Sequence, residues 1–334
     1  MAAGMSQPVR ISVIVPVHNA EHTLDACVDS LLTQTCLPCE IWLIENGSAD
    51  ASAARCRAWE QRDARVRHIS LSQTGVSRAR NVGLEHASGT HITFVDADDT
   101  LPPQALAQLG SQADAADWVW GAYRRGQGGP VIRQDGDQLR RLAQADVAEY
   151  ILSHRMELLV GSVWAKLYRA DLARRCRFPE KIHFAEDNLF NLAYAALAQH
   201  TVLLPAVVYT YMPQPVSLAS RILPHLGAIS CIQEARLTYA RSTKVRNGEA
   251  RVYGCTVNML LRALNEQAAI GSMRAFGAFA DGLMGDEALR TAVAGHSSET
   301  VSYRYGTIAS KLLRGHHYVS LYLLLRLKQK MKHK

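Results

Sequence analysis

Three carboxylates follow an apolar, β-rich stretch of the chain. Asp96, Asp98 and Asp99 come directly after residues 91–95, whose sequence His-Ile-Thr-Phe-Val is typical of a buried strand. In α/β sheets, ligands bind at the carboxyl ends of the strands, so these side chains are expected there. Mg²⁺ and Mn²⁺ prefer hard oxygen ligands and often keep substrate phosphates in their shell. The cluster therefore predicts a divalent-cation site for a phosphate-bearing donor, although an Asp-rich turn or helix cap before Pro102 would have the same composition.

The elements that must position this cluster alternate along the first hundred residues. Apolar runs typical of strands lie at 10–17, 40–44, 65–71 and 91–95. Helical spacing of apolar residues separates them, at 21–33, 51–62 and 76–86. This alternation predicts an α/β fold with a parallel sheet. The Gly/Gln/Arg-rich residues 121–136 are expected to form a surface loop or hairpin, and helical patterns dominate after it.

Two common phosphate-binding motifs are missing from the sequence. The turn after the first strand contains Pro16, His18 and Asn19 and lacks the Gly-x-Gly-x-x-Gly pattern of dinucleotide-binding folds. No Gly-Lys-Ser/Thr follows a strand, which excludes a P-loop. Phosphate charge is therefore expected to be neutralised by a metal and by arginine.

Several ordered motifs give the chain a resemblance to family 2 glycosyltransferases of the GT-A fold, over roughly residues 10–215. The matching segments are Ser-Val-Ile-Val-Pro-Val-His-Asn-Ala at 12–20, Leu-Ile-Glu-Asn-Gly-Ser-Ala-Asp at 43–50, Gly-Val-Ser-Arg-Ala-Arg-Asn-Val-Gly-Leu at 75–84, and the strand with its acidic cluster at 89–99. The resemblance implies a Rossmann-like nucleotide-diphospho-sugar transferase. Its sheet would be mixed and mainly parallel, with helices on both faces and a C-terminal helical extension.

The resemblance also implies an activity and a donor site. The activity is inverting, metal-dependent transfer of a sugar from a nucleotide-diphosphate donor to a glycan or lipid-linked glycan, in capsule, lipopolysaccharide or other cell-surface polysaccharide synthesis. The implied donor contacts are Pro16, His18, Asn19, Glu45, Asn46, Arg80, Asp96 and Ala97. Arg80 is expected beside the diphosphate, because its planar guanidinium bonds phosphate oxygens in pairs. Asp98 is expected to bind Mn²⁺ or Mg²⁺, Asp96 to contact the ribose or the metal's shell, and Asp99 to order the loop.

Asn46 departs from the family pattern at a position that reads the base. The family carries an Asp-Asp pair here, whose second acid contacts uracil in relatives, whereas this chain has Glu45 and Asn46. His18 likewise stands where an aromatic residue is usual. An Asn side chain can accept from uracil N3–H or donate to cytosine N3. A UDP-sugar is the expected donor and a cytidine donor the alternative.

The acidic pair Glu186-Asp187 resembles the family's Glu-Asp motif. In an inverting transfer the acceptor hydroxyl attacks opposite the departing diphosphate, so a carboxylate must take its proton. Asp187 is the expected base and Glu186 the alternative, although acids also gather at helix N-termini for electrostatic reasons alone. On the acceptor side, Trp164 offers a flat face to a sugar ring and Lys166 a cation to an anionic acceptor, with core burial as the alternative for Trp164. His183 is a further candidate for the diphosphate.

Positive charge is concentrated at the C-terminus. No acid follows Glu299, and the net charge of +7 is matched by Lys311, Arg314, Arg326, Lys328, Lys330, Lys332 and Lys334. The apolar residues at 318–327 fall short of the roughly 20 needed to span a bilayer. Two interpretations stay open. The segment is either an amphipathic helix on an anionic membrane, where each Lys gains about 1 kcal/mol, or a helix docked on the protein with a solvated basic end.

These observations predict two regions and a location. Residues 1–220 are expected to form the glycosyltransferase domain, with a nucleotide half at 1–120 and an acceptor and base half at 121–220. Residues 221–334 are expected to form a helical region ending in the basic tail. Scattered cysteines and the absence of a leading signal segment predict a cytoplasmic protein, peripheral on the inner membrane face if the tail binds lipid.

The transfer of a sugar has three alternatives. A non-catalytic nucleotide-sugar-binding or scaffold protein of the same fold is the main alternative. A nucleotidyltransferase is disfavoured because the Gly- and Arg/Lys-rich loop expected after its first strand is missing. No nucleic-acid partner is expected, since no recognition motif accompanies the basic tail.

Overall fold

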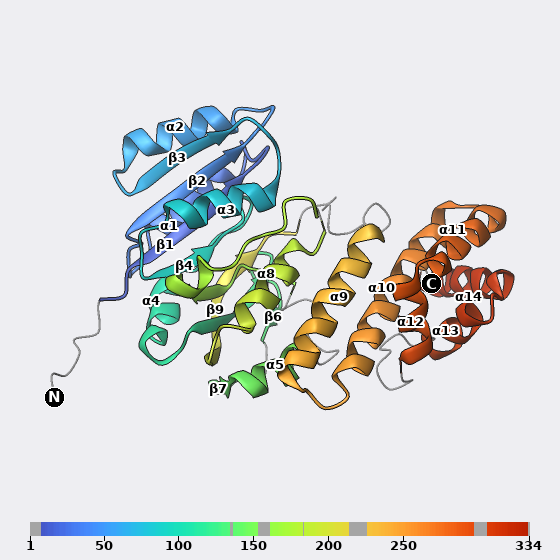
Figure 1. The fold of residues 1–334 in the computed structure, drawn as a ribbon. Helices are drawn as coiled ribbons and strands as arrows, with labels where there is room; N and C mark the ends of the chain where they lie inside the picture. The colour runs from blue at the N-terminus through green and yellow to red at the C-terminus, as the bar shows by residue number, and fades with distance from the viewer. Residues whose placement is uncertain are drawn as a thin grey trace. The chain divides into compact units, whose positions relative to one another are not determined.

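The computed structural model describes residues 8–133, 136–152, 161–182, 184–213, 226–296 and 306–332. The chain divides into two compact units. The first unit comprises residues 1–147 and 159–215, and the second comprises residues 148–158 and 216–334. All strands of the described sheet belong to the first unit, and the second unit is helical (Figure 1).

A mixed, mainly parallel sheet forms the centre of the first unit. Its strand order is β3-β2-β1-β4-β8-β5-β9-β7, with β6 beside β5. β1 to β4 pair in parallel, as do β5 and β9, while β8 runs antiparallel between β4 and β5. The strands are β1 (Ile11–Val17), β2 (Glu40–Asn46), β3 (Val66–Leu71), β4 (His91–Phe94), β5 (Trp118–Arg125), β6 (Val131–Ile132), β7 (Arg140–Ala143), β8 (Lys166–Arg169) and β9 (His200–Tyr211).

Helices cover both faces of the parallel part of the sheet. α1 connects β1 to β2 and α2 connects β2 to β3, so both cross the sheet in the same direction, and they contact each other. α3 runs back from β3 to β4, which lies on the other side of β1. Because such crossovers are right-handed, this reversal places α3 on the opposite face. The predicted α/β fold is thus confirmed. The helices of this unit are α1 (Leu24–Leu32), α2 (Ser52–Arg62), α3 (Val76–His86), α4 (Ala105–Gly110), α5 (Gln144–Leu152), which continues into the second unit, α7 (Ala170–Ala173) and α8 (Glu186–Ala195).

α3 packs unusually close to β1. A Cβ on Gly83 would lie 2.3 Å from Cγ2 of Ile14, so only glycine fits this approach. The opposite end of α3 is held by the backbone N–H of Gly75, which donates to the side-chain oxygen of Asn46 at 2.7 Å. α3 is therefore fixed at both ends against the strands, and Arg80 lies between these two points.

The glycine-rich stretch at 121–136 forms a hairpin over its described residues. β5 continues to Arg125, whose N–H donates to the carbonyl of Pro130 at 3.0 Å, and β6 returns antiparallel to it. Gly126 and Gly128 have φ values of 74° and 73°, a conformation that favours glycine. The hairpin interpretation of this stretch is the one that applies.

The second unit is built around α10. This helix contacts α9, α11, α12, α13 and α14, and it buries Val257, Leu260 and Leu264 completely. None of the helices in the described ranges combines the length and the hydropathy of a membrane span. Its helices are α9 (Leu226–Thr243), α10 (Gly248–Ile270), α11 (Met273–Gly285), α12 (Glu287–Gly295), α13 (Gly306–Arg314) and α14 (Tyr318–Lys332).

Candidate functional site

The carboxyl ends of β1, β2 and β4 bring the predicted donor residues to one edge of the sheet. Val17 is in register with Glu45, and the N–H of Val95 donates to the carbonyl of Ile14 at 3.0 Å. This edge, where α/β folds bind ligands, consequently holds seven of the predicted donor residues: Pro16, His18, Asn19, Glu45, Asn46, Asp96 and Ala97.

The turns after β1 and β2 are tied together by side chains. His18 Nδ1 donates to the carbonyl of Asn46 at 2.9 Å. Asn19, at φ 49°, accepts from the N–H of Ala49 at 2.9 Å through Oδ1. His18 and Asn19 are exposed, so a ligand at this edge can reach them. Pro16 lies buried within β1, directly before Val17, the last residue of the strand.

Glu45 and Asn46 are nearly buried at the end of β2. Glu45 Oε1 accepts from the N–H of Ser48 at 2.6 Å, which is turn chemistry of the kind its position predicts. Because the N–H of Gly75 can only donate, the atom that it contacts must be Asn46 Oδ1, and this fixes the orientation of the amide. Among the described residues, Gly75 is the one partner of the Asn46 side chain, so one lone pair and the amide N–H groups are available to a ligand.

Arg80 forms the centre of a buried charge cluster. Its Nη1 donates to Asp187 Oδ1 at 2.6 Å and to Glu186 Oε1 at 3.1 Å, and its Nη2 donates to Asp96 Oδ1 at 3.1 Å. The Arg80 side chain is 5% exposed. Residues from α3, α8 and the loop after β4 thus meet on one guanidinium. Three acids around one cation leave an excess of negative charge at this point.

Asp187 is placed by the start of α8. Ala185, immediately before this helix, has a left-handed φ of 57°, and the N–H of Val163 donates to Asp187 Oδ2 at 3.2 Å. Burial raises the pKa of Asp187 to about 7, against the opposing charge of Arg80 and with further increases from Glu186 and Asp96. A carboxyl group with a pKa in this range can exchange a proton near neutral pH.

Asp99 links the acidic loop to the end of β9. It is fully buried, and its carboxylate accepts from Tyr209 Oη at 2.7 Å and from the N–H of Met212 at 2.6 Å. Tyr209 Oη in turn accepts from the N–H of Asp96 at 3.1 Å. Burial foremost, and then Asp96, raise the pKa of Asp99 to about 8. Asp99 therefore anchors the acidic loop to the end of β9 from a buried position, while Asp96 and Asp98 are partly exposed.

The exposed pair of acids fits a metal that shares its ligands with a substrate. Asp96 and Asp98 are two residues apart on the open edge, and the Asp96 side chain is 30% exposed. Mg²⁺ is commonly held by one or two carboxylates together with substrate phosphates and water. Within the described ranges, no three His, Cys, Asp or Glu side chains are grouped to hold a metal by themselves. The two carboxylates thus suit a metal ion whose remaining ligands are phosphate oxygens and water.

Trp164 belongs to an aromatic stack beside the acidic loop. Its ring lies 4.7 Å from that of Tyr209 at 12°, and 5.8 Å from that of Tyr211 at 14°, with the edge of Tyr123 at 4.9 Å. Tyr209 also contacts Asp96 and Asp99, so the stack is continuous with the acidic loop. Tyr123 is not among the residues predicted from sequence, and Tyr209 and Tyr211, which resemble the family's return to the sheet, are not among the predicted acceptor-side residues. The i, i+2 spacing of the two β9 tyrosines is the signal that places them on one face.

Lys166 is buried rather than presented to a ligand. It is 1% exposed, and its Nζ donates to the carbonyl of Ser162 at 2.6 Å and lies 5.1 Å from the Trp120 ring centroid. Burial lowers its pKa to about 7, with Asp187 opposing. The predicted contact with an anionic acceptor would require the surrounding side chains to move. His183 lies outside the described residues.

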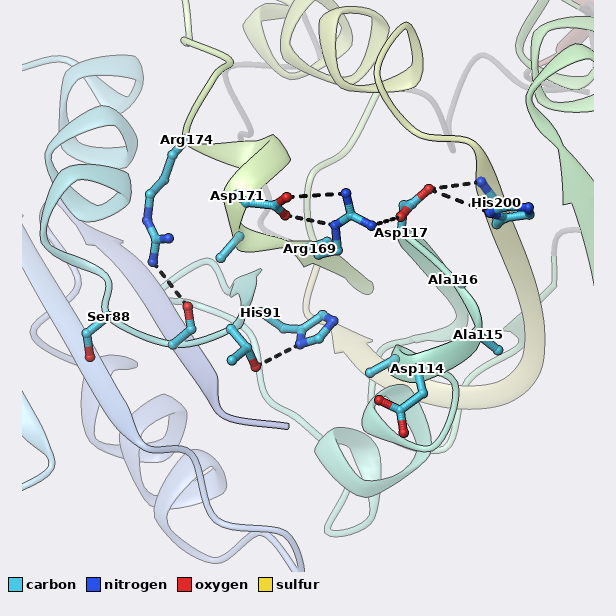
Figure 2. Close-up of a pocket in the computed structure, with 14 residues that line it drawn as sticks. Ser88, His91, Asp114, Ala115, Ala116, Asp117, Arg169, Asp171, Arg174 and His200 are labelled. Atoms are coloured by element: carbon cyan, nitrogen blue, oxygen red, sulfur yellow. Dashed lines mark hydrogen bonds and ion pairs between the residues drawn. The ribbon is translucent and has the colours of Figure 1, made fainter. Parts of the chain in front are cut away.

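A pocket lies at the amino ends of β4 and β9, away from the candidate site. It has a volume of about 730 Å³ and includes His91 and His200, the first residues of β4 and β9. Figure 2 shows Arg169 held between Asp117 and Asp171, and Arg174 directed at backbone oxygen. Its arginines are thus engaged by the protein, and none of the residues predicted for the site lines it.

The residues that match a known protein family lie mainly in the first unit. Residues 12–175 match the family described as Glycosyl transferase family 2. The uncharacterized glycosyltransferase EpsJ of Bacillus subtilis is 34% identical over 214 residues, which are 62% of each chain. The succinoglycan biosynthesis protein ExoO of Rhizobium meliloti is 29% identical over 242 residues, 68% of each chain. The aligned part of the chain thus spans 62% of the length of EpsJ.

Solved structures extend the likeness to the whole chain at the level of fold. S. aureus TarS 1–349 in complex with UDP-GlcNAc has a TM-score of 0.71 at 18% identity, covering 96% of this chain and 92% of that one. The mannosyltransferase PcManGT from Pyrobaculum calidifontis, in complex with GDP-Man and Mn²⁺, has a TM-score of 0.50 at 17% identity, covering 97% and 89%. These neighbours confirm the predicted GT-A fold.

Proposed function

Since residues 12–175 match glycosyltransferase family 2, we propose that the chain is an inverting glycosyltransferase that uses a nucleotide-diphosphate sugar. The observation that carries this proposal is the Arg80 cluster, in which Asp187 and Asp96 bond to the same guanidinium. In this proposal Asp187 accepts the proton of the acceptor hydroxyl, and Asp96 lies at the open edge where a donor diphosphate would bind. Base and donor site are thereby fixed relative to each other.

The proposed step needs one proton acceptor. The oxygen of an acceptor hydroxyl attacks the anomeric carbon of the donor sugar, and its proton passes to Asp187. The bond between that carbon and the diphosphate oxygen breaks, and the diphosphate leaves with the bonding electron pair. The raised pKa of Asp187, about 7, supports this role because a base is most effective when its pKa is near the working pH. Glu186 supports it indirectly by raising that pKa.

We infer that Asp98, assisted by Asp96, holds Mn²⁺ or Mg²⁺. When bound there, a divalent cation would neutralise charge on the leaving diphosphate. Supporting observations are the partial exposure of both acids and the excess of carboxylates around Arg80. Arg80 itself would contact the diphosphate through Nη2, which donates to Asp96 and carries a second N–H. Mn²⁺ accompanies the GDP-Man complex of the structural neighbour PcManGT.

A UDP-sugar remains the donor that we propose. The free lone pair of Asn46 Oδ1 can accept from uracil N3–H while the amide donates to the adjacent carbonyl oxygen. UDP-GlcNAc is the ligand of the structural neighbour TarS. The same amide could instead donate to cytosine N3, so the choice of base depends on where the ring sits against Asn46. Asn46→Asp should favour UDP over CDP, because a carboxylate accepts from N3–H and cannot donate.

For the acceptor we propose a glycan or a lipid-linked glycan of cell-surface polysaccharide synthesis. The half-buried ring of Trp164, stacked on Tyr209 and Tyr211, supplies a rigid apolar surface of the kind that packs on sugar rings. ExoO, a succinoglycan biosynthesis protein, is a relative that aligns over 68% of each chain. The linkage would be set by which hydroxyl reaches Asp187.

The deciding experiment is a calorimetric titration of the protein with UDP, CDP and GDP, each with Mn²⁺ and with EDTA. We expect UDP to bind in a metal-dependent manner and the other two more weakly. A preference for CDP would identify Asn46 as the residue that changes base specificity. Binding without turnover of any UDP-sugar would support the non-catalytic alternative, and absence of nucleotide binding would contradict the proposed site.

A further inference from the structure

The last helix of the second unit carries an apolar stripe that its packing does not use. α14 buries Leu321 and Leu325 against the unit, at 0% and 1% exposure. Val319, Leu323 and Leu327 are 53%, 53% and 62% exposed, and their spacing of four places them on one side of the helix. A helix that rests on its own protein usually has polar residues on its other side. Over the ranges that the structure describes, more than half of the surface of each of these three side chains is left exposed.

The exposed apolar surface continues beyond α14. Tyr322 Oη donates to the carbonyl of Gly271 at 3.2 Å, and Arg326 Nη1 donates to the carbonyl of Ala269 at 3.2 Å. These bonds hold the end of α10 beside α14. Ile270, which lies between the two carbonyls in sequence, is 78% exposed, and Met273 is 47% exposed. We define the α14 patch as Ile270, Met273, Val319, Leu323 and Leu327, where the ends of α10 and α11 meet α14 (Figure 1).

The charge around the α14 patch has one dominant sign. Arg326 is exposed between Leu323 and Leu327, and Lys328 follows them. The sequence of α14 contains no acid and continues with Lys330 and Lys332. Two described carboxylates near the patch already face basic side chains: Glu266, one turn before Ile270 on α10, lies 3.4 Å from Arg262, and Asp281 of α11 lies 3.8 Å from His316. Cations therefore accumulate at the C-terminal end of the exposed stripe.

We propose that the α14 patch docks on an anionic lipid surface. An exposed apolar stripe flanked by Lys and Arg is the pattern of a helix that lies in the membrane interface, with apolar side chains at the headgroup boundary and cations at the lipid phosphates. A second copy of the chain fits the surface less well. Both copies would bring a surface with an excess of cations to the interface, and these like charges would repel.

The test uses the full chain and vesicles of phosphatidylcholine, with or without phosphatidylglycerol, in a sedimentation assay. We expect the protein to partition onto the anionic vesicles and the triple variant Val319→Ser/Leu323→Ser/Leu327→Ser to lose about tenfold or more in partitioning. Leu37→Ser is the matched control, since Leu37 is 57% exposed but belongs to the first unit. It should bind as the unchanged protein does. Arg326→Gln/Lys328→Gln should weaken binding and make it less sensitive to salt.

Three results would overturn the proposal. The unchanged chain could show no preference for anionic vesicles, or the triple variant, with an unaltered melting temperature, could bind them equally well. The chain could also sediment as a dimer without lipid and the triple variant as a monomer, which would identify the α14 patch as an interface between copies. Nucleotide binding should be the same in all variants, so failure of this proposal is separable from failure of the proposed function.

Discussion

Asp187 and Asp98 have different proposed duties, and single substitutions separate them. Asp187→Asn keeps the shape of the side chain but removes the proton acceptor, so we expect UDP to bind normally and transfer to fall by about 10²–10⁴-fold. Asp98→Ala should instead abolish the metal-dependent part of UDP binding. Calorimetry of UDP with Mn²⁺, combined with turnover of a UDP-sugar, distinguishes the two. Equal loss of binding in both variants would contradict the assignment.

The environment of Asp187 also predicts a pH profile. Burial raises the pKa of its carboxyl group to about 7, so the proton-accepting form increases as the pH rises through that value. The rate at low substrate should rise about tenfold per pH unit below this point and level off above it. Glu186→Gln removes a charge that raises this pKa, so the profile of that variant should move to lower pH. A profile that is flat through neutral pH would exclude Asp187 as the base.

Folding stability should respond to the same group with the opposite sign. The pKa of Asp187 is higher in the folded chain than its ordinary value of 3.8, so the folded state binds more protons between these values. This contribution is therefore fully present at low pH and is lost as the pH rises through about 7. Activity and this part of the stability thus oppose each other, which is the usual cost of a buried base.

Arg80 shows what single residues do and do not reveal from sequence. Its motif predicts a functional arginine, but its three partners lie 16 to 107 positions away, and no local pattern shows that they meet. Lys166 is the reverse case, because lysine is exposed by default and here lies 1% exposed. Arg80→Ala should lower the free energy of unfolding by about 3–5 kcal/mol, since it leaves buried carboxylates unpaired. Denaturant unfolding measures this, and a loss below that of a surface arginine would contradict it.

At the scale of elements, the close contact between α3 and β1 is the feature that holds Arg80 in place. A methyl group on Gly83 would lie 2.3 Å from Ile14, so Gly83→Ala should cost about 1–3 kcal/mol through overpacking and also weaken nucleotide binding. Gly277→Ala in α11 is the control, since nothing lies within 4 Å of the added carbon. Better helix propensity should stabilise that variant by about 0.5–1 kcal/mol. Thermal unfolding of both variants, with UDP titrations, compares the two sites.

The elements near the N-terminus were also the ones that sequence could predict. Residues 10–95 alternate between strand and helix patterns, and the observed β1 to β4 follow them because each βα unit buries its own apolar stripe. β8 could not be found this way. It has four residues, and its antiparallel place between β4 and β5 depends on partners far along the chain. The contacts of Trp164 with Tyr209 and Tyr211 depend on that placement in the same way.

At the scale of the whole molecule, the candidate site and the α14 patch belong to different units, and ligands should affect them separately. The site residues lie on α3, α8 and the loops after β1, β2 and β4, all in the first unit, whereas α10 to α14 belong to the second. UDP with Mn²⁺ should therefore slow amide hydrogen exchange in residues 75–84 and 95–101, because binding the folded state suppresses local opening there. Exchange in α11 and α12 should stay unchanged.

Lipid should give the complementary pattern. Anionic vesicles should protect α14 and the end of α10, through burial of Leu323, Leu327 and Ile270, and leave α3 unaffected. Mass-spectrometric exchange with each ligand alone and with both together measures the two effects in one experiment. If UDP and Mn²⁺ protected α14 as strongly as α3, the two units would be energetically coupled, and lipid binding would then have to change nucleotide affinity by the same factor.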